Sequence, residues 1–377
     1  MKKIVALLCI LQFLACDTEP TSPLDIALKS KHPAIKEVME DPNGYEVQIL
    51  YTQIDKDSTG AVTFTDYSFQ LDAGNYFYPA SSVKLPVAVL AVEKLIHNFD
   101  SLTLDSPYRI GNDSALHTVG DDILKIFTVS DNEAYNRLYE YLGRDYCNKR
   151  LRRLGLSPVR ITHRLDVDSA ANQKRKTLFF PKKDTLPVAY NSDKDGSIEK
   201  TILKGTQKGK SFMRNDSLIK KPMDFSQKNY FPLKTQHDLL KRIFFEDNFS
   251  KEEQFGLTPS AKETLTTAMR TLPREAGYNQ KEFYDSYGKF FIFGDSKDPI
   301  PDHIKIYNKV GYAYGTLTDT AYIVDEKEGV QFLLSATILV NKNGIFNDEV
   351  YEYETIGIPF LAQLGREIYN YELRRKK

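Results

Sequence analysis

The segment Tyr78–Ile96 constrains the fold more than any other part of the chain. It reads YPASSVKLPVAVLAVEKLI, and eight of the ten residues from Val83 to Val92 are Val, Leu or Ala. A helix that is apolar on every side belongs in the interior of a protein. Pro86 suits only the first turn of such a helix, because proline has no N–H for the helical ladder. The sequence therefore predicts a central buried helix that begins close to Ser81.

Ser81 and Lys84 form a Ser-x-x-Lys arrangement at the start of this helix. Residues three apart share a helix face, and the hydroxyl lies near the positive end of the helix dipole. A lysine that burial strips of water loses its proton more readily and can serve as the base for a neighbouring nucleophile. The pattern alone is weak evidence, because average composition produces it about once or twice by chance in a chain of this length.

The first twenty residues, MKKIVALLCILQFLACDTEP, have the pattern of an export signal. Two lysines precede an apolar stretch, Ile4 to Ala15, that is too short for a stable membrane anchor. Phe13-Leu14-Ala15-Cys16 resembles the bacterial lipobox, whose cysteine is lipidated; the alternative is an ordinary secretory signal with Cys16 present by chance. We expect a signal peptide over residues 1–15, a lipid on Cys16 and a tether over residues 16–23. The protein would then lie in the cell envelope, facing the periplasm or the cell surface.

Composition limits the classes of function. Hydrophobic residues make up 41% of the 377-residue chain, which allows a sizeable core. The 51 Lys and Arg balance the 51 Asp and Glu, so no nucleic-acid partner is indicated. Cys147 is the only cysteine beyond the export region, which leaves no intramolecular disulfide, and we expect it to be a small core residue. Clustered Cys and His spacings are absent from the sequence, so we expect no metal and no other cofactor.

Hydrophobic periodicity predicts strands near both ends of the chain and helices between them. Strand patterns cover 45–55, 62–71, 304–307, 316–324 and 332–340. Helical patterns cover 24–39, 121–129, 133–142, 146–154, 236–245, 260–272 and 359–373. We predict an α+β fold over residues 24–377. One antiparallel sheet is built from both chain ends, and an all-helical subdomain over about 81–300 is inserted between them.

A basic segment over about 174–232 interrupts the helical pattern. It has several strand-like pieces, and its lysines and arginines outnumber its acids. One interpretation is a solvated, variable insertion. The other is a surface that attracts anionic cell-envelope polymers or lipid headgroups.

Two further motifs follow the Ser-x-x-Lys pair in the chain: Ser130-Asp131-Asn132 and Lys309-Val310-Gly311. Singly, the first is also a common helix N-cap and the second a solvated strand. Together and in this order they resemble the serine β-lactamase and penicillin-binding-protein superfamily, and class A β-lactamases in detail. Asn136 and the run Arg164-Leu165-Asp166, which matches the start of the family's omega loop, add to the resemblance. It covers about Leu24 to Leu373 apart from the basic segment and implies a three-layer α/β/α arrangement.

The resemblance implies a role for each residue of the site. Ser81 is the nucleophile, and the backbone N–H groups of Ser81 and Tyr312 form the oxyanion hole. Ser130 relays a proton to the leaving nitrogen, while Lys84 and Lys309 keep the site positive and orient the two serines. Substrate binding falls to Asn132, Gly311, Tyr312 and Asn172, and support of the omega loop to Asn136, Arg164 and Asp166.

Two departures from the family pattern bear on turnover. The omega loop has no Glu, but a one-residue deletion lets Asp168 and Asn172 reproduce the family's Glu-x-x-x-Asn spacing. Asp168 is therefore our candidate deacylation base, with a purely structural role in the loop as the alternative. Val310 replaces the usual Thr or Ser, and 315–320 has no Arg for a substrate carboxylate, although Thr316 and Thr318 are possible substitutes.

We therefore expect a covalent serine hydrolase of β-lactam amides. A peptidase or esterase of the same fold, acting on cell-wall-derived acyl compounds with slow β-lactam turnover, is the first alternative. A non-catalytic binding lipoprotein that uses the basic segment as its contact surface is the second. In each case we expect a monomer, attached to the membrane through its lipid, with a small-molecule substrate or ligand and no nucleic acid.

Overall fold

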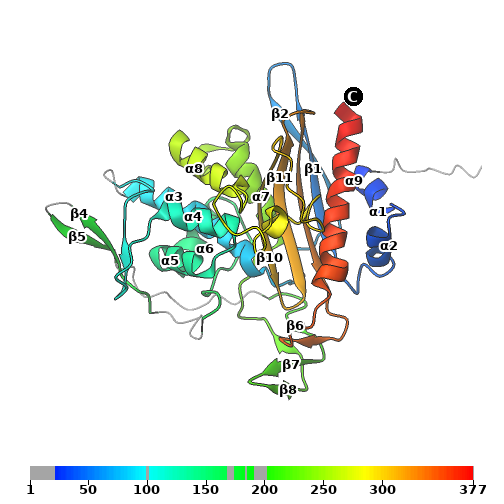
Figure 1. Cartoon of the computed structure of the whole chain (residues 1–377), viewed down its shortest axis with the longest axis horizontal. Helices are drawn as coiled ribbons and strands as arrows, with labels where there is room; N and C mark the ends of the chain where they lie inside the picture. Colours follow the sequence, from blue (N-terminus) through cyan, green and yellow to red (C-terminus); the bar gives the residue numbers. More distant parts are fainter. Residues whose placement is uncertain (1–21, 99–101, 168–173, 183–184, 191–201, 377) are drawn as a thin grey trace, which may run out of the picture.

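A five-stranded antiparallel sheet forms the centre of the molecule, in the order β10-β11-β12-β1-β2 (Figure 1). The structure is a computed structural model that describes residues 22–98, 102–167, 174–182, 185–190 and 202–376. The N-terminal part of the chain supplies β1 (Gln48–Lys56) and β2 (Val62–Phe69). The C-terminal part supplies β10 (Ile304–Ala313), β11 (Thr316–Asp325) and β12 (Val330–Leu339). The prediction of one sheet built from both chain ends is confirmed, and β10 is one of its edge strands.

Helices cover both faces of the sheet and make three layers (Figure 1). One face carries α1 (Pro23–Leu28), α2 (Pro33–Met39) and α9 (Ile358–Lys376). The other carries α3 (Lys84–Asn98), α4 (Val119–Thr128), α5 (Asn132–Leu142), α6 (Arg144–Arg153), α7 (Leu233–Phe244) and α8 (Pro259–Arg270). Short helical turns are η1 (Ala80–Val83), η2 (Glu246–Asn248), η3 (Lys251–Glu253), η4 (Asp285–Gly288) and the π-helical η5 (Tyr353–Gly357). The predicted fold class is confirmed.

Two predicted elements differ from the structure by more than a shift of about three residues at their ends. The single helix expected over 24–39 is two helices, because Pro33 begins α2 and the side chain of His32 caps it by accepting from the N–H of Ala34. Proline at the first helical position starts a new helix rather than continuing the previous one. The strand expected over 304–307 continues to Ala313 and so contains Lys309, Val310 and Gly311.

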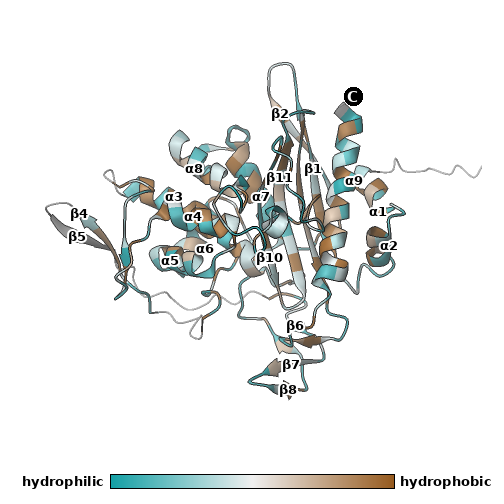
Figure 2. Ribbon diagram, viewed as in Figure 1, coloured by the Kyte–Doolittle hydropathy of each residue, from teal (hydrophilic) through white to brown (hydrophobic). Residues whose placement is uncertain are grey.

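The apolar core lies on both sides of the sheet. One cluster joins the sheet to α3 and its neighbouring helices, and a second joins it to α1, α2 and α9. Every residue of α3 from Lys84 to Leu95 is buried, as its composition predicts. Cys147 is buried in the first cluster, as expected for a small core residue. Figure 2 shows α9 with hydrophobic and hydrophilic residues alternating along its turns, which suits a helix with one buried face.

Part of the described basic segment packs against the rest of the protein rather than being solvated. With short partner strands it forms three small sheets from β3 (Arg109–Ile110), β4 (Leu178–Lys182), β5 (Thr185–Tyr190), β6 (Gln207–Lys208), β7 (Ser211–Arg214), β8 (Ser217–Ile219), β9 (Met223–Asp224) and β13 (Ile345–Phe346). Its aromatic residues Phe212, Phe225 and Tyr230 are buried in a third cluster together with Tyr78 and Ala80. The interpretation as a solvated insertion is therefore wrong for these residues, which support the chain just before Ser81.

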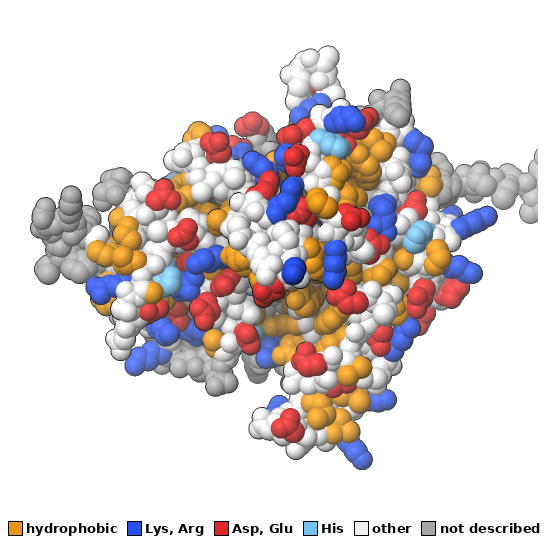
Figure 3. Space-filling view, viewed as in Figure 1, with side chains coloured by type: hydrophobic (Ala, Val, Ile, Leu, Met, Phe, Trp, Pro, Cys, Tyr) orange, Lys and Arg blue, Asp and Glu red, His pale blue; other side chains and the backbone are white. Residues whose placement is uncertain are grey.

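The surface shows no segregation of charge on the face seen in Figure 3, where acidic and basic side chains are interspersed. Within the described ranges, no helix is both long enough and apolar enough to cross a membrane.

Candidate active site

Ser81 lies in η1, directly before α3, at the mouth of the buried helix as predicted. The preceding residue, Ala80, has a φ of 45°, in the left-handed region that non-glycine residues seldom adopt. The N–H of Ser82 donates to the carbonyl oxygen of Pro79 over 3.0 Å and closes the turn. Ser82 is fully buried, whereas Ser81 is partly exposed. This tight turn therefore presents one of two neighbouring hydroxyls to a ligand.

Lys84 is fully buried next to the Ser130 motif. Its Nζ donates to the carbonyl oxygen of Ser130, to Oδ1 of Asn132 over 2.6 Å and to Oγ of Ser130 over 3.2 Å. Burial lowers the pKa of Lys84 to about 7, while the nearby charges of Asp131 and Asp166 act in the opposite direction. Lys84 is thus available as a neutral base near neutral pH, as the Ser-x-x-Lys spacing predicts.

Lys309 reaches the same hydroxyl from the other side. Its Nζ donates over 2.9 Å both to Oγ of Ser130 and to the carbonyl oxygen of Val310. Burial lowers the pKa of Lys309 well below its ordinary value, and the charge of Lys84 lowers it further. The Ser130 hydroxyl is therefore held between two lysines from segments far apart in the sequence.

Gly311 allows β10 to pass directly beside η1. A Cβ at this position would lie 2.4 Å from the carbonyl oxygen of Pro79 and 3.1 Å from the backbone nitrogen of Ser81. Only glycine permits this approach, because real Cβ atoms do not come so close to backbone atoms. The contact brings together the two segments that carry the predicted oxyanion donors, the N–H groups of Ser81 and Tyr312.

The omega-loop residues that the structure describes are tied to α5. The amide of Asn136 accepts from the N–H of Leu165 over 2.8 Å and donates to the Leu165 carbonyl over 2.9 Å. Nε of Arg164 donates to Oε1 of Glu140 over 2.6 Å. Asp166 is exposed, and its Oδ2 accepts from Nδ2 of Asn132 over 3.5 Å. Asp168 and Asn172 lie outside the described residues, as does Cys16.

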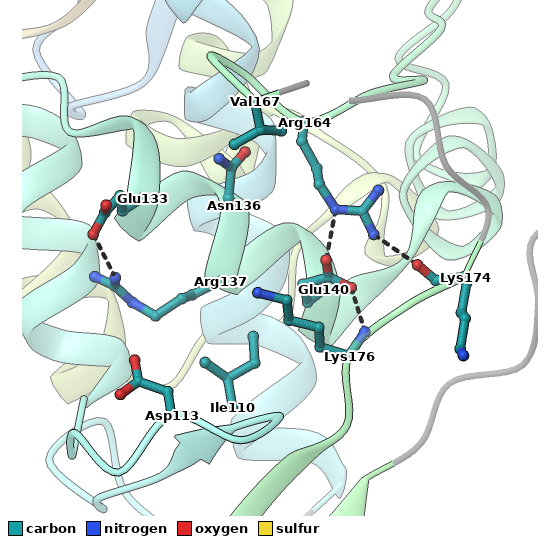
Figure 4. Close-up of a pocket in the computed structure, with 10 residues that line it drawn as sticks. All are labelled: Ile110, Asp113, Glu133, Asn136, Arg137, Glu140, Arg164, Val167, Lys174 and Lys176. Carbon is teal, nitrogen blue, oxygen red and sulfur yellow. Dashed lines mark hydrogen bonds and ion pairs between the residues drawn. The ribbon is translucent and has the colours of Figure 1, made fainter. Parts of the chain in front are cut away.

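Behind this loop anchor lies a pocket of about 400 Å³ (Figure 4). Glu140 stands at its centre, accepting from Arg164 and, over 2.8 Å, from the backbone N–H of Lys176. Both acidic and basic side chains line the pocket around Glu140 and Arg164: Asp113, Glu133, Arg137 and Lys174. Its described lining includes Asn136 and Arg164 but neither serine and neither lysine of the site, so we assign the pocket to the support of the loop.

The residues considered as carboxylate partners are buried. Val310 is 3% exposed and packs in the core cluster on the face of β10 opposite Lys309. Thr318 has no exposed surface, and its hydroxyl donates to Oγ1 of Thr337 over 2.9 Å. Thr316 is 3% exposed. The suggestion that Thr318 replaces the usual hydroxyl at the site is therefore wrong.

A buried polar network behind Lys309 was not predicted. Oδ1 of Asp319 accepts from Nδ2 of Asn308 over 2.8 Å, and its Oδ2 accepts from the N–H of Phe290 over 3.0 Å. Nζ of Lys289 donates to Oδ1 of Asn308 over 2.7 Å. Burial raises the pKa of Asp319 to about 6 and lowers that of Lys289 to about 7. The sequence did contain a signal for this network, because Asp319 is a carboxylate within the otherwise uncharged strand segment Thr316–Val324.

The described residues contain no group of three or more His, Cys, Asp or Glu side chains placed to hold a metal ion. The chemistry that this arrangement supports is nucleophilic: Ser81 lies three residues before a lysine of lowered pKa, and that lysine contacts a second hydroxyl, on Ser130, that is positioned to carry a proton.

Comparison with known proteins agrees with the predicted resemblance. Residues 31–185 match the model of the beta-lactamase enzyme family. The solved structure of L2 complexed with relebactam is 14% identical, with a TM-score of 0.50 over 93% of this chain and 98% of that chain. A mutant of PBP-A, solved as an acyl-enzyme complex with penicillin G, is 14% identical, with a TM-score of 0.51 over 93% and 98%. No curated protein matches the sequence significantly. The predicted resemblance to β-lactamases is confirmed by the family match over residues 31–185, and the solved structures show the fold.

Proposed function

We propose that this protein, which has the fold of the serine β-lactamases and PBP-A, forms an acyl-enzyme on Ser81 and hydrolyses β-lactam amide bonds. The observation that carries the proposal is the Ser130 hydroxyl, which lies 3.2 Å from Nζ of Lys84 and 2.9 Å from Nζ of Lys309. A core serine needs no such pair of buried lysines, since each buried charge carries a large desolvation cost. The arrangement suits proton transfer.

In the acylation step, Oγ of Ser81 attacks the carbonyl carbon while its proton passes to neutral Lys84. The N–H groups of Ser81 and Tyr312 stabilise the oxyanion. The C–N bond then breaks as Ser130 gives its proton to the leaving nitrogen and regains one from Lys84. Ser81 is left as an ester of the substrate acyl group, and Lys84 is again neutral.

In the deacylation step, water adds to the ester carbonyl and gives a proton to the carboxylate of Asp168. The ester C–O bond breaks, Ser81 recovers a proton, and the acid product leaves. Asp is one methylene shorter than Glu, and a displacement of about 1 Å can cost roughly a hundredfold in rate. We therefore expect deacylation to be the slow step.

A second candidate is a peptidase or esterase of the same fold that acts on cell-wall-derived acyl compounds and turns over β-lactams slowly. The observation that favours it is Val310, which is buried in the core and offers no hydroxyl to a substrate carboxylate. Losing a hydrogen-bond partner of a carboxylate costs roughly 1–3 kcal/mol of binding.

The test is incubation of the protein with a chromogenic cephalosporin and a labelled penicillin, followed by intact mass and peptide mapping. Turnover with a transient adduct on Ser81 supports the first proposal. A stable adduct without turnover supports the second. Ser81→Ala should abolish the adduct. Ser82→Ala is the matched control, because Oγ of Ser82 is buried without a hydrogen-bond partner in the described structure and should be dispensable. An adduct that persists in Ser81→Ala, or no adduct at all, would leave a non-catalytic binding lipoprotein.

The loop assignment has its own test. Asp168→Asn should prolong the life of the acyl-enzyme by about a hundredfold or more without changing the rate at which it forms. Asp166→Asn is the control on the neighbouring carboxylate and should leave deacylation within about threefold, since Asp166 contacts Asn132 rather than the ester. Unchanged deacylation in Asp168→Asn would exclude Asp168 as the base.

We also propose that the protein is exported and anchored by a lipid on Cys16, on the evidence of the lipobox-like sequence. Metabolic labelling with a fatty-acid analogue should label the full-length protein and its Cys9→Ser variant. Cys16→Ser should lose the label and leave the membrane fraction. A labelled Cys16→Ser protein would contradict the assignment.

A further inference from the structure

A small aromatic cavity lies next to Tyr312, on the face of β10 away from Lys309. Its volume is about 80 Å³. The walls include four tyrosine rings, one phenylalanine ring and one carboxylate: Tyr284, Tyr287, Phe290, Tyr312, Tyr353 and Glu354. The Tyr312 ring centroid lies 5.6 Å from that of Tyr353 and 6.3 Å from that of Phe290. At about 30 Å³ for each water in the liquid, the cavity has room for a small head group and not for a whole ligand.

The cavity is close to the proposed reaction centre. Gly311, the residue before Tyr312, contacts the turn that carries Ser81, where an added Cβ would lie 3.1 Å from the Ser81 backbone nitrogen. The Tyr312 side chain is 45% exposed, so the rim of the cavity is open to solvent. A substrate whose carbonyl lies between Ser81 and Tyr312 would therefore lie beside the open rim of this cavity.

The charge of the cavity selects the kind of substituent. Glu354 is exposed and is the only charged side chain in the described lining, which has no Lys, Arg or His. A carboxylate here would face both Glu354 and the negative faces of the rings. An ammonium group would be attracted by both, as in aromatic cages that bind ammonium ligands. Lys297 lies outside the lining and places its Nζ 5.3 Å from the ring centroid of Tyr284. This ring therefore already makes one cation–π contact in the folded protein.

We propose that this cavity is a subsite for an ammonium group on the leaving-group side of the substrate. The proposal rests on the proposed hydrolase function of Ser81 and names the substrate class for that site: acyl compounds whose leaving group carries a free amine. It also accounts for the buried Val310, since a site that receives an ammonium group has no use for a hydroxyl that binds a carboxylate.

The test uses three aryl esters of phenylacetylglycine that differ at one position. Their leaving groups are 3-(aminomethyl)phenol, 3-ethylphenol and 3-(carboxymethyl)phenol, which have similar size and carry positive, zero and negative charge. We expect kcat/KM for the aminomethyl ester to exceed that for the ethyl ester by about three- to tenfold, the range of a partly exposed cation–π site. The carboxymethyl ester should be the slowest.

The variants place the effect in the cavity. Glu354→Gln and Tyr284→Leu should each lower the ratio of kcat/KM for the aminomethyl ester to kcat/KM for the ethyl ester at least about threefold. Glu328→Gln is the matched control, because Glu328 is an exposed acid in the turn between β11 and β12. An equal rate for the aminomethyl and ethyl esters, or a preference that survives both cavity variants, would overturn the proposal.

Acylation of Ser81 by the ethyl ester distinguishes an error in the subsite proposal from an error in the proposed hydrolase function. If the ethyl ester acylates Ser81 but the charge has no effect, only the subsite is wrong. If no ester acylates Ser81, the hydrolase is wrong, and the cavity is then tested directly in Ser81→Ala protein. Benzylammonium should shift the NMR signals of the cavity tyrosine rings, and phenylacetate should not. Equal shifts with both compounds, or none with benzylammonium, would overturn the subsite as well.

Discussion

The two faces of strand β10 differ in chemistry, although the same ten residues supply both. Lys309 and Gly311 point toward the helical layer, where one contacts Ser130 and the other lies against the turn of Ser81. Val310 and Tyr312 point the other way, into the core cluster and the aromatic cavity. Side chains alternate along a strand, so a single edge strand separates the polar groups that move protons from the apolar surface beside them.

Burial has a chemical effect on only one of these two faces. Where β10 faces the helical layer, burial lowers the pKa of Lys309 and of Lys84 in α3, so that a lysine can act as a base. On the apolar face it contributes core packing and shape. Substitutions on the two faces should therefore have effects of different kind and size.

Removal of the Lys84 amine should have the largest effect, a loss of acylation. Lys84→Met keeps the length of the side chain but removes the amine that contacts Ser130 and Asn132. Loss of a general base typically costs 10²–10⁴-fold, so we expect the acylation rate to fall by about a thousandfold. Stopped-flow measurement of the acylation burst checks this. Lys305→Met, on the same face of β10, should act as wild type, and a loss below about tenfold in Lys84→Met would break the assignment.

Widening the contact between β10 and η1 should have the next largest effect. In Gly311→Ala the new methyl group meets the carbonyl oxygen of Pro79 at 2.4 Å, so one of the two segments must move. We expect acylation to slow by about a hundredfold and the free energy of unfolding to fall by about 1–3 kcal/mol. Kinetics and urea unfolding measure the two effects. Gly288→Ala, where the nearest atoms are 3.8 Å away, should show neither, and a fully active Gly311→Ala enzyme would contradict the close approach.

The pH dependence should follow Lys84. Because its pKa is lowered to about 7, the acylation rate should rise with pH and level off above about 7. The folded pKa lies below the ordinary value of 10.5, so between these values the unfolded chain binds more protons than the folded one. Stability should therefore rise with pH across this window. Urea unfolding of wild type and Lys84→Met at pH 6 to 10 checks it: the free energy of unfolding of wild type relative to that of Lys84→Met should rise with pH, and a constant difference would show an unshifted lysine.

Adding a hydroxyl to the apolar face should have the smallest effect on activity. Val310→Thr restores the residue type usual in the family but buries an extra polar group among apolar neighbours. We expect a loss of about 1–2 kcal/mol in the free energy of unfolding and penicillin acylation within about twofold of wild type. Val330→Thr, in the same cluster on β12, should lose similar stability. A tenfold gain in acylation by Val310→Thr alone would show that this position faces the substrate after all.

The sequence alone predicted the elements whose signals are local. The apolar run after Ser81 required a buried helix, and alternation at both chain ends required the sheet. Two elements were mispredicted for different reasons. Pro33 is a local signal that divides the first predicted helix, whereas β10 extends past Tyr307 because β11 offers it a hydrogen-bonding partner as far as Ala313.

The tertiary structure determines which side chains are in contact and how far burial removes each of them from water. Ser130 and Lys309 are 179 residues apart, yet they share a hydrogen bond. The aromatic cavity combines η4, β10 and η5, and no periodicity in any of them indicates the other two. A pKa is set by desolvation and by neighbouring charge. Both depend on the packed structure, so the sequence can name Lys84 as a candidate base, but only the fold makes it one.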